Sequence, residues 1–146
     1  MKVREVMTND VCIANPEQSV CEAACLMADI DAGALPVGEN DRLVGMITDR
    51  DITVRAVAQG RSPDTKIRDV MSTEVLYCFE DEDLDDVAKN MSDMKVRRLP
   101  VLNRDKRLVG ILSIGDLVLH EDSKTAGQTI AHISEHGGAH SQTTAH

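Results

Sequence analysis

Two short segments of the chain carry a hydroxyl and a carboxylate at the same spacing. One is Gly45-Met46-Ile47-Thr48-Asp49-Arg50-Asp51, and the other is Gly110-Ile111-Leu112-Ser113-Ile114-Gly115-Asp116. In each, a strand that ends at the hydroxyl would lead into a helix, where Thr48 or Ser113 can cap the N-terminus or donate to a phosphate or ribose oxygen. Asp51 and Asp116 would lie in the first helical turn, where a carboxylate complements the helix dipole and can accept the hydroxyls of a ribose.

The two segments belong to an internal repeat, which gives the pattern more weight than a single helix-capping sequence would have. Val3–Thr8 returns as Ile67–Ser72, and Leu35–Val37 returns as Leu99–Val101, both 64 residues later. Leu-Val-Gly returns 65 residues later, with the extra residue in a polar turn that tolerates an insertion. The repeat predicts two units and a polar, partly disordered, His-containing C-terminal tail: residues 1–60, 61–120 and 121–146.

Each unit is predicted to have the order strand, helix, strand, strand, helix, and therefore an α/β fold. The opening strands are expected at residues 11–13 and 75–77, and a second helix at residues 49–58. The first helix of each unit follows an N-cap, Ser19 or Asp83, and has one apolar face: Val20, Ala23, Ala24, Met27 and Leu84, Val87, Ala88, Met91. Two such repeats, packed with pseudo-twofold symmetry, would leave clefts for small ligands between them.

This arrangement resembles the tandem cystathionine-β-synthase (CBS) domain pair, also called a Bateman module. The resemblance covers about residues 3–120 and rests on the Val-x-x-Val-Met-Thr-like openings, both Leu-Pro-Val strands and both Gly-h-h-Ser/Thr-x-x-Asp endings, where h is apolar. It implies clefts that bind adenosine derivatives: AMP, ADP or ATP, and in some members S-adenosylmethionine or NAD-type cofactors. In such proteins the motif Asp holds the ribose and the motif Ser or Thr contacts ribose or phosphate, which here implies Asp51 with Thr48 and Asp116 with Ser113.

The resemblance also implies how the adenine edge is held. In such proteins the backbone and apolar side chains of the Leu-Pro-Val strand and of the opening strand meet it. The corresponding residues are Ala34, Leu35 and Val37, or Arg98, Leu99 and Val101, together with residues 11–13 or 75–77. The scarcity of aromatic residues agrees with a base held between aliphatic side chains.

The two copies differ in their arginine residues. Arg50 stands where the second motif has Gly115, while Arg97 and Arg98 stand where the first copy has glycine and alanine. A guanidinium at a phosphate forms a charge-assisted, bidentate contact. An arginine that is solvated, or paired with one of the 25 acidic residues, would not contact a ligand. The sequence leaves both interpretations open.

Composition excludes several classes of function. The 146 residues carry a net charge of −9, and Tyr77 and Phe79 are the only aromatic residues, so neither nucleic acid nor an anionic membrane is an expected partner. No apolar run approaches about 20 residues, the length that crosses a bilayer, and no secretory signal is seen, so the expected location is the cytoplasm. Motifs of catalytic serine, P-loop and zinc-protease sites are absent. We therefore expect a non-enzymatic sensor of energy or stress that forms a homodimer and signals to an effector protein of unknown identity.

The cysteines leave another class of function open. Cys12, Cys21, Cys25 and Cys78 form no C-x-x-C motif and are expected as reduced thiols. Cys21 and Cys25 lie one helical turn apart, at positions that match charged residues of the second copy. Their face of the helix should therefore be exposed, and an alternative function is that of a thiol- or metal-responsive stress protein.

The histidines of the C-terminal segment belong to the same alternative. His132, His136 and His140 recur every four residues, a spacing that can hold a metal on one helix face. A short helix is expected over residues 129–135, but Gly137-Gly138 interrupts the pattern, so we favour a solvated tail without a metal. A second alternative is a structural dimeric adaptor whose clefts stay empty.

Overall fold

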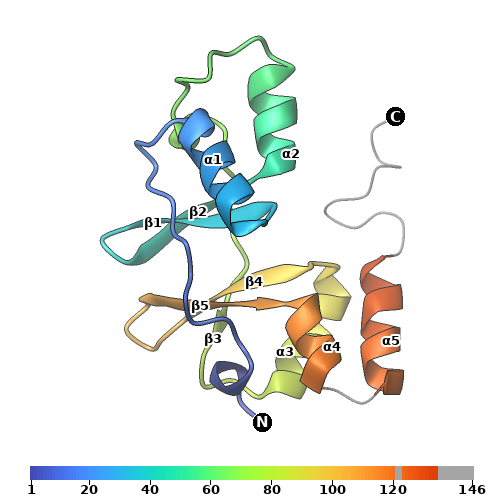
Figure 1. Cartoon of the computed structure of the whole chain (residues 1–146). Coiled ribbons are helices and arrows are strands. Elements are labelled where there is room, and N and C mark those ends of the chain that lie inside the picture. Colours follow the sequence, from blue (N-terminus) through green and yellow to red (C-terminus); the bar gives the residue numbers. More distant parts are fainter. Residues whose placement is uncertain (121–122, 135–146) are drawn as a thin grey trace. The chain divides into compact units, whose positions relative to one another are not determined.

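The computed structural model describes residues 1–120 and 123–134, which form two compact units (Figure 1). The α1 unit contains Cys12–Val75 and Lys106–Leu108. The α3 unit contains Met1–Val11, Leu76–Asp105 and the described residues from Val109 onward. The opening segment of each repeat thus belongs to the unit that is formed by the body of the other repeat. The repeat boundaries at residues 60 and 120 stay a prediction from the sequence.

The α1 unit contains a long helix, a β-hairpin and a second helical segment. Its elements are α1 (Val20–Ile30), β1 (Ala34–Glu39), β2 (Arg42–Thr48), α2 (Asp49–Asp51), the π-helical η2 (Ile52–Val57) and the 3-10 turn η3 (Ile67–Asp69). Ser19 caps α1, as the sequence predicts, by accepting a hydrogen bond from the backbone N–H of Glu22 at 3.0 Å. The hairpin turns at Asn40 and Asp41, whose φ angles of 54° and 63° suit a two-residue β-turn.

The α3 unit repeats this plan and adds a third strand and a C-terminal helix. Its elements are η1 (Val3–Glu5), β3 (Cys78–Phe79), α3 (Leu84–Met94), β4 (Arg98–Leu102), β5 (Leu108–Ser113), α4 (Ile114–His120) and α5 (Ser123–Ile133), with Leu108 itself grouped in the α1 unit. The strand order is β3-β4-β5, and β3 runs parallel to β4. Asp83 caps α3 by accepting a hydrogen bond from the backbone N–H of Asp85 at 2.9 Å.

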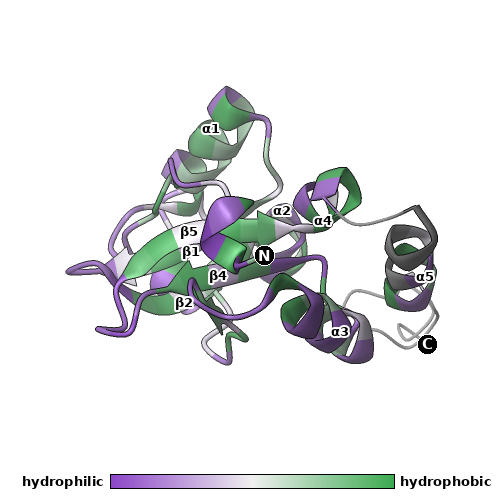
Figure 2. Cartoon of the chain, turned by 90° about the horizontal axis from the view of Figure 1, so that it is seen from below, coloured by the Kyte–Doolittle hydropathy of each residue, from purple (hydrophilic) through white to green (hydrophobic). Residues whose placement is uncertain are grey.

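Each unit has its own hydrophobic cluster, built largely from the strands and from one face of α1 or α3. Figure 2 shows that hydrophobic residues dominate strands β1 and β4, whereas α1 and α3 carry both hydrophobic and hydrophilic residues. The cluster of the α1 unit consists of Ala14, Val20, Ala23, Met27, Leu35, Val37, Ile47, Ala56, Ile67 and Val70. That of the α3 unit consists of Val3, Val6, Cys78, Leu84, Val87, Ala88, Met91, Leu99, Val101, Leu112, Leu117 and Ile133. The predicted helix faces are confirmed except at Ala24, which is exposed. Leu26, on the other flank of the face, packs against the cluster instead.

The opening strands predicted at residues 11–13 and 75–77 are wrong in position. Residues 11–13 belong to no strand, and the backbone first meets β1 at a parallel bridge between Ala14 and Val37. Strand β3 begins at Cys78, while Leu76 and Tyr77 are exposed. A run of three apolar residues is too short to show where a strand begins. The point at which the backbone reaches β1 or β4 therefore decides which residues pair.

The C-terminal segment contains a packed helix where the sequence predicts mostly tail. Helix α5 begins at Ser123 rather than near residue 129, and it packs against α3 and α4. Ile133 is 4% exposed and joins the cluster of the α3 unit. The polar composition of this segment gives little sign of that packing, because Ile133 is the one buried apolar side chain among those of α5 that the structure describes. Residues 135–146 lie outside the described residues.

The opening segments cross the motif strands at glycine residues. Ser72 and Met46 exchange two backbone hydrogen bonds, both of 2.9 Å, and Thr8 and Ile111 exchange two of 2.9 and 3.0 Å. A Cβ atom on Gly45 would lie 2.7 Å from the Ser72 carbonyl oxygen, and one on Gly110 would lie 2.9 Å from that of Thr8. The glycine of each Leu-Val-Gly sequence therefore permits the close approach of a second backbone.

Candidate functional site

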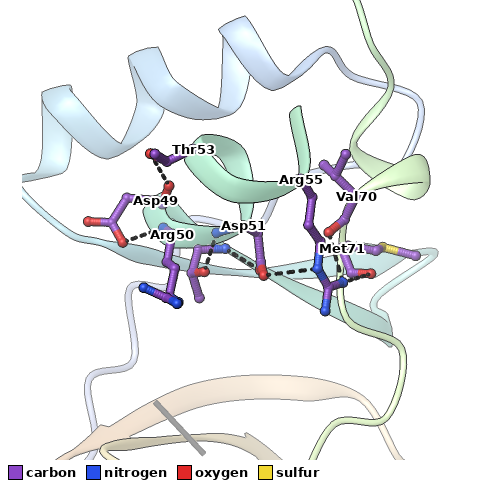
Figure 3. A network of polar contacts seen from close by, with 8 residues as sticks. Asp49, Arg50, Asp51, Thr53, Arg55, Val70 and Met71 are labelled. Atoms are coloured by element: carbon purple, nitrogen blue, oxygen red, sulfur yellow. Dashed lines mark hydrogen bonds and ion pairs between the residues drawn. The ribbon is translucent and has the colours of Figure 1, made fainter. Parts of the chain in front are cut away.

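The first motif closes a pair of hydrogen bonds around the start of α2 (Figure 3). The backbone N–H of Asp51 donates to Thr48 Oγ1 at 3.0 Å, and the backbone N–H of Thr48 donates to Asp51 Oδ2 at 2.9 Å. Strand β2 ends at Thr48 and α2 begins at Asp49, which confirms the predicted strand-to-helix junction. The arrangement is a capping box in which the serine or threonine hydroxyl acts as an acceptor.

The second motif has the same geometry at the start of α4. The backbone N–H of Asp116 donates to Ser113 Oγ at 3.3 Å, and the backbone N–H of Ser113 donates to Asp116 Oδ2 at 2.9 Å. Both caps leave the hydroxyl proton and the carboxylate Oδ1 outside the reciprocal pair. We call the half-buried pairs Thr48 with Asp51 and Ser113 with Asp116 the two motif corners. Each corner presents a hydroxyl donor beside a charged acceptor, a combination that suits a vicinal diol such as that of a ribose.

The two carboxylates differ in the side chain four residues later. Arg55 Nε lies 3.8 Å from Asp51 Oδ1, and Arg55 Nη1 donates to the carbonyl oxygens of Val70 and Met71 at 3.3 and 3.4 Å (Figure 3). Arg55 therefore connects the motif helix to the opening segment of the second repeat. The matching position after Asp116 is His120, which is exposed.

Replacing Arg55 tests whether this connection stabilises the α1 unit. We expect Arg55→Ala to lower the free energy of unfolding by about 0.5–1.5 kcal/mol, because two carbonyl oxygens lose their donor. The measurement is chemical denaturation followed by circular dichroism. Arg50→Ala is the matched control, expected within about 0.5 kcal/mol of the parent chain because the Arg50 side chain is exposed. Equal stability of the two variants would contradict the role of Arg55.

The Leu-Pro-Val strands contribute to the corners mainly through their backbones. Leu35 and Val37 lie in the cluster of the α1 unit, and Leu99 and Val101 lie in that of the α3 unit. Ala34 is also buried and pairs with Thr48 across the hairpin. These side chains fill the cores, so a ligand at a corner would meet the strands through backbone groups. The assignment of these residues to an adenine site stays a prediction, as does a cleft between the repeats.

Three arginines of interest are exposed and unpaired within the described part of the chain. Arg50 follows the first hydroxyl by two residues, and its side chain forms no hydrogen bond or ion pair with residues 1–120 and 123–134 (Figure 3). The same holds for Arg97 and Arg98. The backbone N–H of Ile114 donates to the Arg97 carbonyl oxygen at 3.0 Å, which places the start of β4 beside the second motif. Of the two interpretations left open by the sequence, pairing with a surface carboxylate does not occur for these three arginines within the described residues.

Sequence reasoning missed two hydroxyl residues that lie beside the motif strands. Ser72 is bonded to Met46, two residues before Thr48, and Thr8 is bonded to Ile111, two residues before Ser113. Both come from the opening segment of the other repeat. The signal was present in the sequence, because a hydroxyl ends both copies of the opening segment, but only the fold shows which motif each one meets.

The four cysteines occupy three kinds of environment. Cys78 is buried in the cluster of the α3 unit, and this burial raises its thiol pKa to about 12, so the thiol is inert. Cys21 and Cys25 are exposed on α1, as predicted, and Cys12 is half-buried. The neighbouring Cys21, followed by desolvation and the carboxylates of Asp29 and Glu22, raises the pKa of the Cys25 thiol.

Candidate metal ligands do not cluster within residues 1–120 and 123–134, where no group of three or more His, Cys, Asp or Glu residues could hold an ion. His132 lies half-buried on α5, while His136 and His140 lie outside the described residues. In the same part of the chain, no helix has both the length and the apolar character that crossing a membrane requires.

Comparison with known proteins identifies the family. The model of the CBS domain family matches residues 3–57 and again residues 67–122. The chain belongs to the CBS domain family. A similar relative is the CBS domain-containing protein YhcV of Bacillus subtilis, which is 41% identical over 133 residues, spanning 90% of this chain and 94% of the relative. The predicted α/β fold with two CBS repeats is thereby confirmed, and proteins of this kind are regulatory ligand-binding modules that are generally not catalytic.

Solved CBS domain structures share this fold. The CBS domain pair of protein MJ0100, in complex with 5-methylthioadenosine and S-adenosyl-L-methionine, is 30% identical, with a TM-score of 0.71 over 82% of this chain and 94% of that one. CBSX2 in complex with AMP is 28% identical, with a TM-score of 0.71 over 81% and 93%. Hypoxic Response Protein I with two coordinated zinc ions is 32% identical, with a TM-score of 0.75 over 83% and 99%.

Proposed function

We propose that each motif corner binds the ribose of an adenosine-containing nucleotide, of which AMP, ADP and ATP are the candidates. The observation that carries the proposal is the doubled capping box, in which Asp51 and Asp116 each keep one oxygen outside the cap. That oxygen accepts a hydrogen bond from a ribose hydroxyl, and the hydroxyl of Thr48 or Ser113 donates a hydrogen bond to a ribose or phosphate oxygen. Complexes of CBSX2 with AMP and of MJ0100 with S-adenosyl-L-methionine support an adenosine ligand.

The bound nucleotide acts as a regulatory signal, without a chemical reaction of its own. Each corner combines a motif from one repeat with an opening segment from the other, as Thr48 and Ser72 illustrate. A ligand that contacts both the motif and the opening segment would stabilise the backbone pairing of Ser72 with Met46. It would thereby reduce the conformational freedom of the residues that follow Ser72. We propose that a homodimer in the cytoplasm presents this change to an effector protein, in response to energy supply or stress.

The exposed arginines give the two corners different affinities for the phosphate group of a nucleotide. Arg50→Ala and Arg98→Ala are each expected to lower the preference for AMP over adenosine about tenfold at one site, the effect of losing a charge-assisted contact of about 1.5 kcal/mol. Adenosine affinity should stay near that of the parent chain, and the preference for AMP should weaken as salt rises. Calorimetric titration with adenosine and AMP measures both. An unchanged ratio in both variants would show that these arginines do not contact phosphate.

The alternative function is metal or thiol sensing with empty corners. The two zinc ions of Hypoxic Response Protein I favour this alternative. Titration of the full chain with Zn²⁺ and with AMP separates the two functions. Saturable binding of AMP that Asp51→Asn and Asp116→Asn reduce supports the nucleotide sites, whereas binding of Zn²⁺ alone supports the alternative.

A further inference from the structure

The outward face of α1 carries two thiols that neither core packing nor the motif corners use. Cys21 and Cys25 are both exposed and lie four residues apart, one turn along α1. The buried face of the helix is formed by Val20, Ala23 and Met27. The matching positions on α3 are Asp85 and Lys89, so the pair occurs in one repeat only.

The helix geometry disfavours a disulfide between these thiols. Residues four apart on a helix have Cβ atoms about 5–6 Å apart, whereas a disulfide needs Cβ atoms about 3.5–4.5 Å apart. An ion held between two thiolates at about 2.3 Å from each sulfur spans up to about 4.6 Å between the sulfurs. The pair is therefore too widely spaced for an unstrained cross-link and well spaced for a shared ion.

The charges around the pair favour a cation. The carboxylates of Glu22 and Asp29 lie close enough to act electrostatically on Cys25. Helix α1 contains neither lysine nor arginine. These negatively charged surroundings attract a metal ion and repel anionic oxidants and glutathione.

We propose that Cys21 and Cys25 form a two-thiolate site for one soft, low-coordinate cation of the Cu(I) class. Thiolates select soft ions, and two ligands satisfy an ion that does not require four. Within the described residues the thiols have no third ligand to complete a tetrahedral zinc site. Binding replaces the two thiol protons by the ion, with no change in the oxidation state of copper or sulfur. The site is independent of the nucleotide corners.

Anaerobic titration of the full chain with Cu(I), against a chromogenic Cu(I) chelator, tests the proposal. The parent chain is expected to withdraw one equivalent of Cu(I) from the chelator and to release two protons. Cys21→Ser and Cys25→Ser are each expected to lose that equivalent. Cys12→Ser, which removes a half-buried thiol elsewhere, is the matched control and should bind like the parent chain.

Further readouts separate this two-thiolate site from copper binding elsewhere on the chain. Circular dichroism should show unchanged folding of the serine variants, as expected for exposed positions, and AMP titration should give unchanged affinity. Retention of the Cu(I) equivalent by Cys21→Ser and Cys25→Ser would place the ion elsewhere, for example on the C-terminal histidines, and would overturn the proposal. A stoichiometry of one ion per two chains would also overturn it, because the site would then bridge two copies.

Discussion

The Asp116→Asn variant is expected to bind AMP at the α3 unit about 10- to 100-fold more weakly than the parent chain. The amide oxygen of Asn can still accept the hydrogen bond from the Ser113 backbone N–H, so the cap survives. The remaining amide group then offers a donor where the ribose needs a charged acceptor. Asp51→Asn should have the same effect at the α1 unit. Calorimetric titration with AMP measures the loss.

Stability is the control for these substitutions. Removing a carboxylate from a first helical turn should lower the free energy of unfolding by only about 0.3–1 kcal/mol. A large effect on AMP affinity with a small effect on unfolding assigns Asp51 and Asp116 to ligand binding. Parent-like AMP affinity in both variants would show that the carboxylates serve the helix caps alone.

Gly110→Ala and Gly45→Ala are expected to produce the largest losses of stability. The new methyl group would lie 2.9 Å from the Thr8 carbonyl oxygen and 2.5 Å from Met7 Sδ. The thioether can move, but the Thr8 backbone is held by two hydrogen bonds to Ile111. Overpacking of this kind costs about 1–3 kcal/mol. Gly45→Ala should behave similarly, because its methyl group would meet the Ser72 carbonyl oxygen at 2.7 Å.

Thermal unfolding measures this effect, with a shift in Tm of about 2–4 °C for each kcal/mol. Gly127→Ala in α5 is the matched control, because a Cβ at Gly127 meets no atom of the described residues within 4 Å. It should leave Tm unchanged or raise it, since alanine favours a helix over glycine by about 0.5–1 kcal/mol. If Gly110→Ala unfolded at the same temperature as the parent chain, the crossing of the opening segments would not have the tight packing described.

Local patterns predicted the parts of the fold that depend on local physics. The apolar spacing of Leu84, Val87, Ala88 and Met91 was sufficient to identify the buried face of α3, and Ser19 was recognisable as an N-cap. Ala24 shows the limit of such reasoning, because a small side chain at the edge of a helix face is buried only if a neighbour covers it. The two-residue strand β3 and the start of α5 at Ser123, six residues before the predicted helix, could not be predicted, because tertiary contacts define both.

The candidate site also contains features that the local sequence predicts and features that depend on contacts between distant segments. The hydroxyl and carboxylate of each motif could be predicted together because a capping box is local, and both boxes are present. The contact of Arg55 with Val70 and Met71 could not be predicted, because it joins segments 15 and 16 residues apart. The repeat showed which segments are similar, but not that each opening segment packs on the body of the other repeat.

Titration of the full-length chain with AMP, with adenosine as the uncharged comparison, tests the central claim most directly. The parent chain should bind AMP saturably at two sites of unequal affinity, and the double variant carrying Asp51→Asn and Asp116→Asn should lose both while remaining folded by circular dichroism. Absence of saturable binding of adenosine, AMP, ADP and ATP by the folded parent chain, or retention of both sites in the folded double variant, would contradict the account.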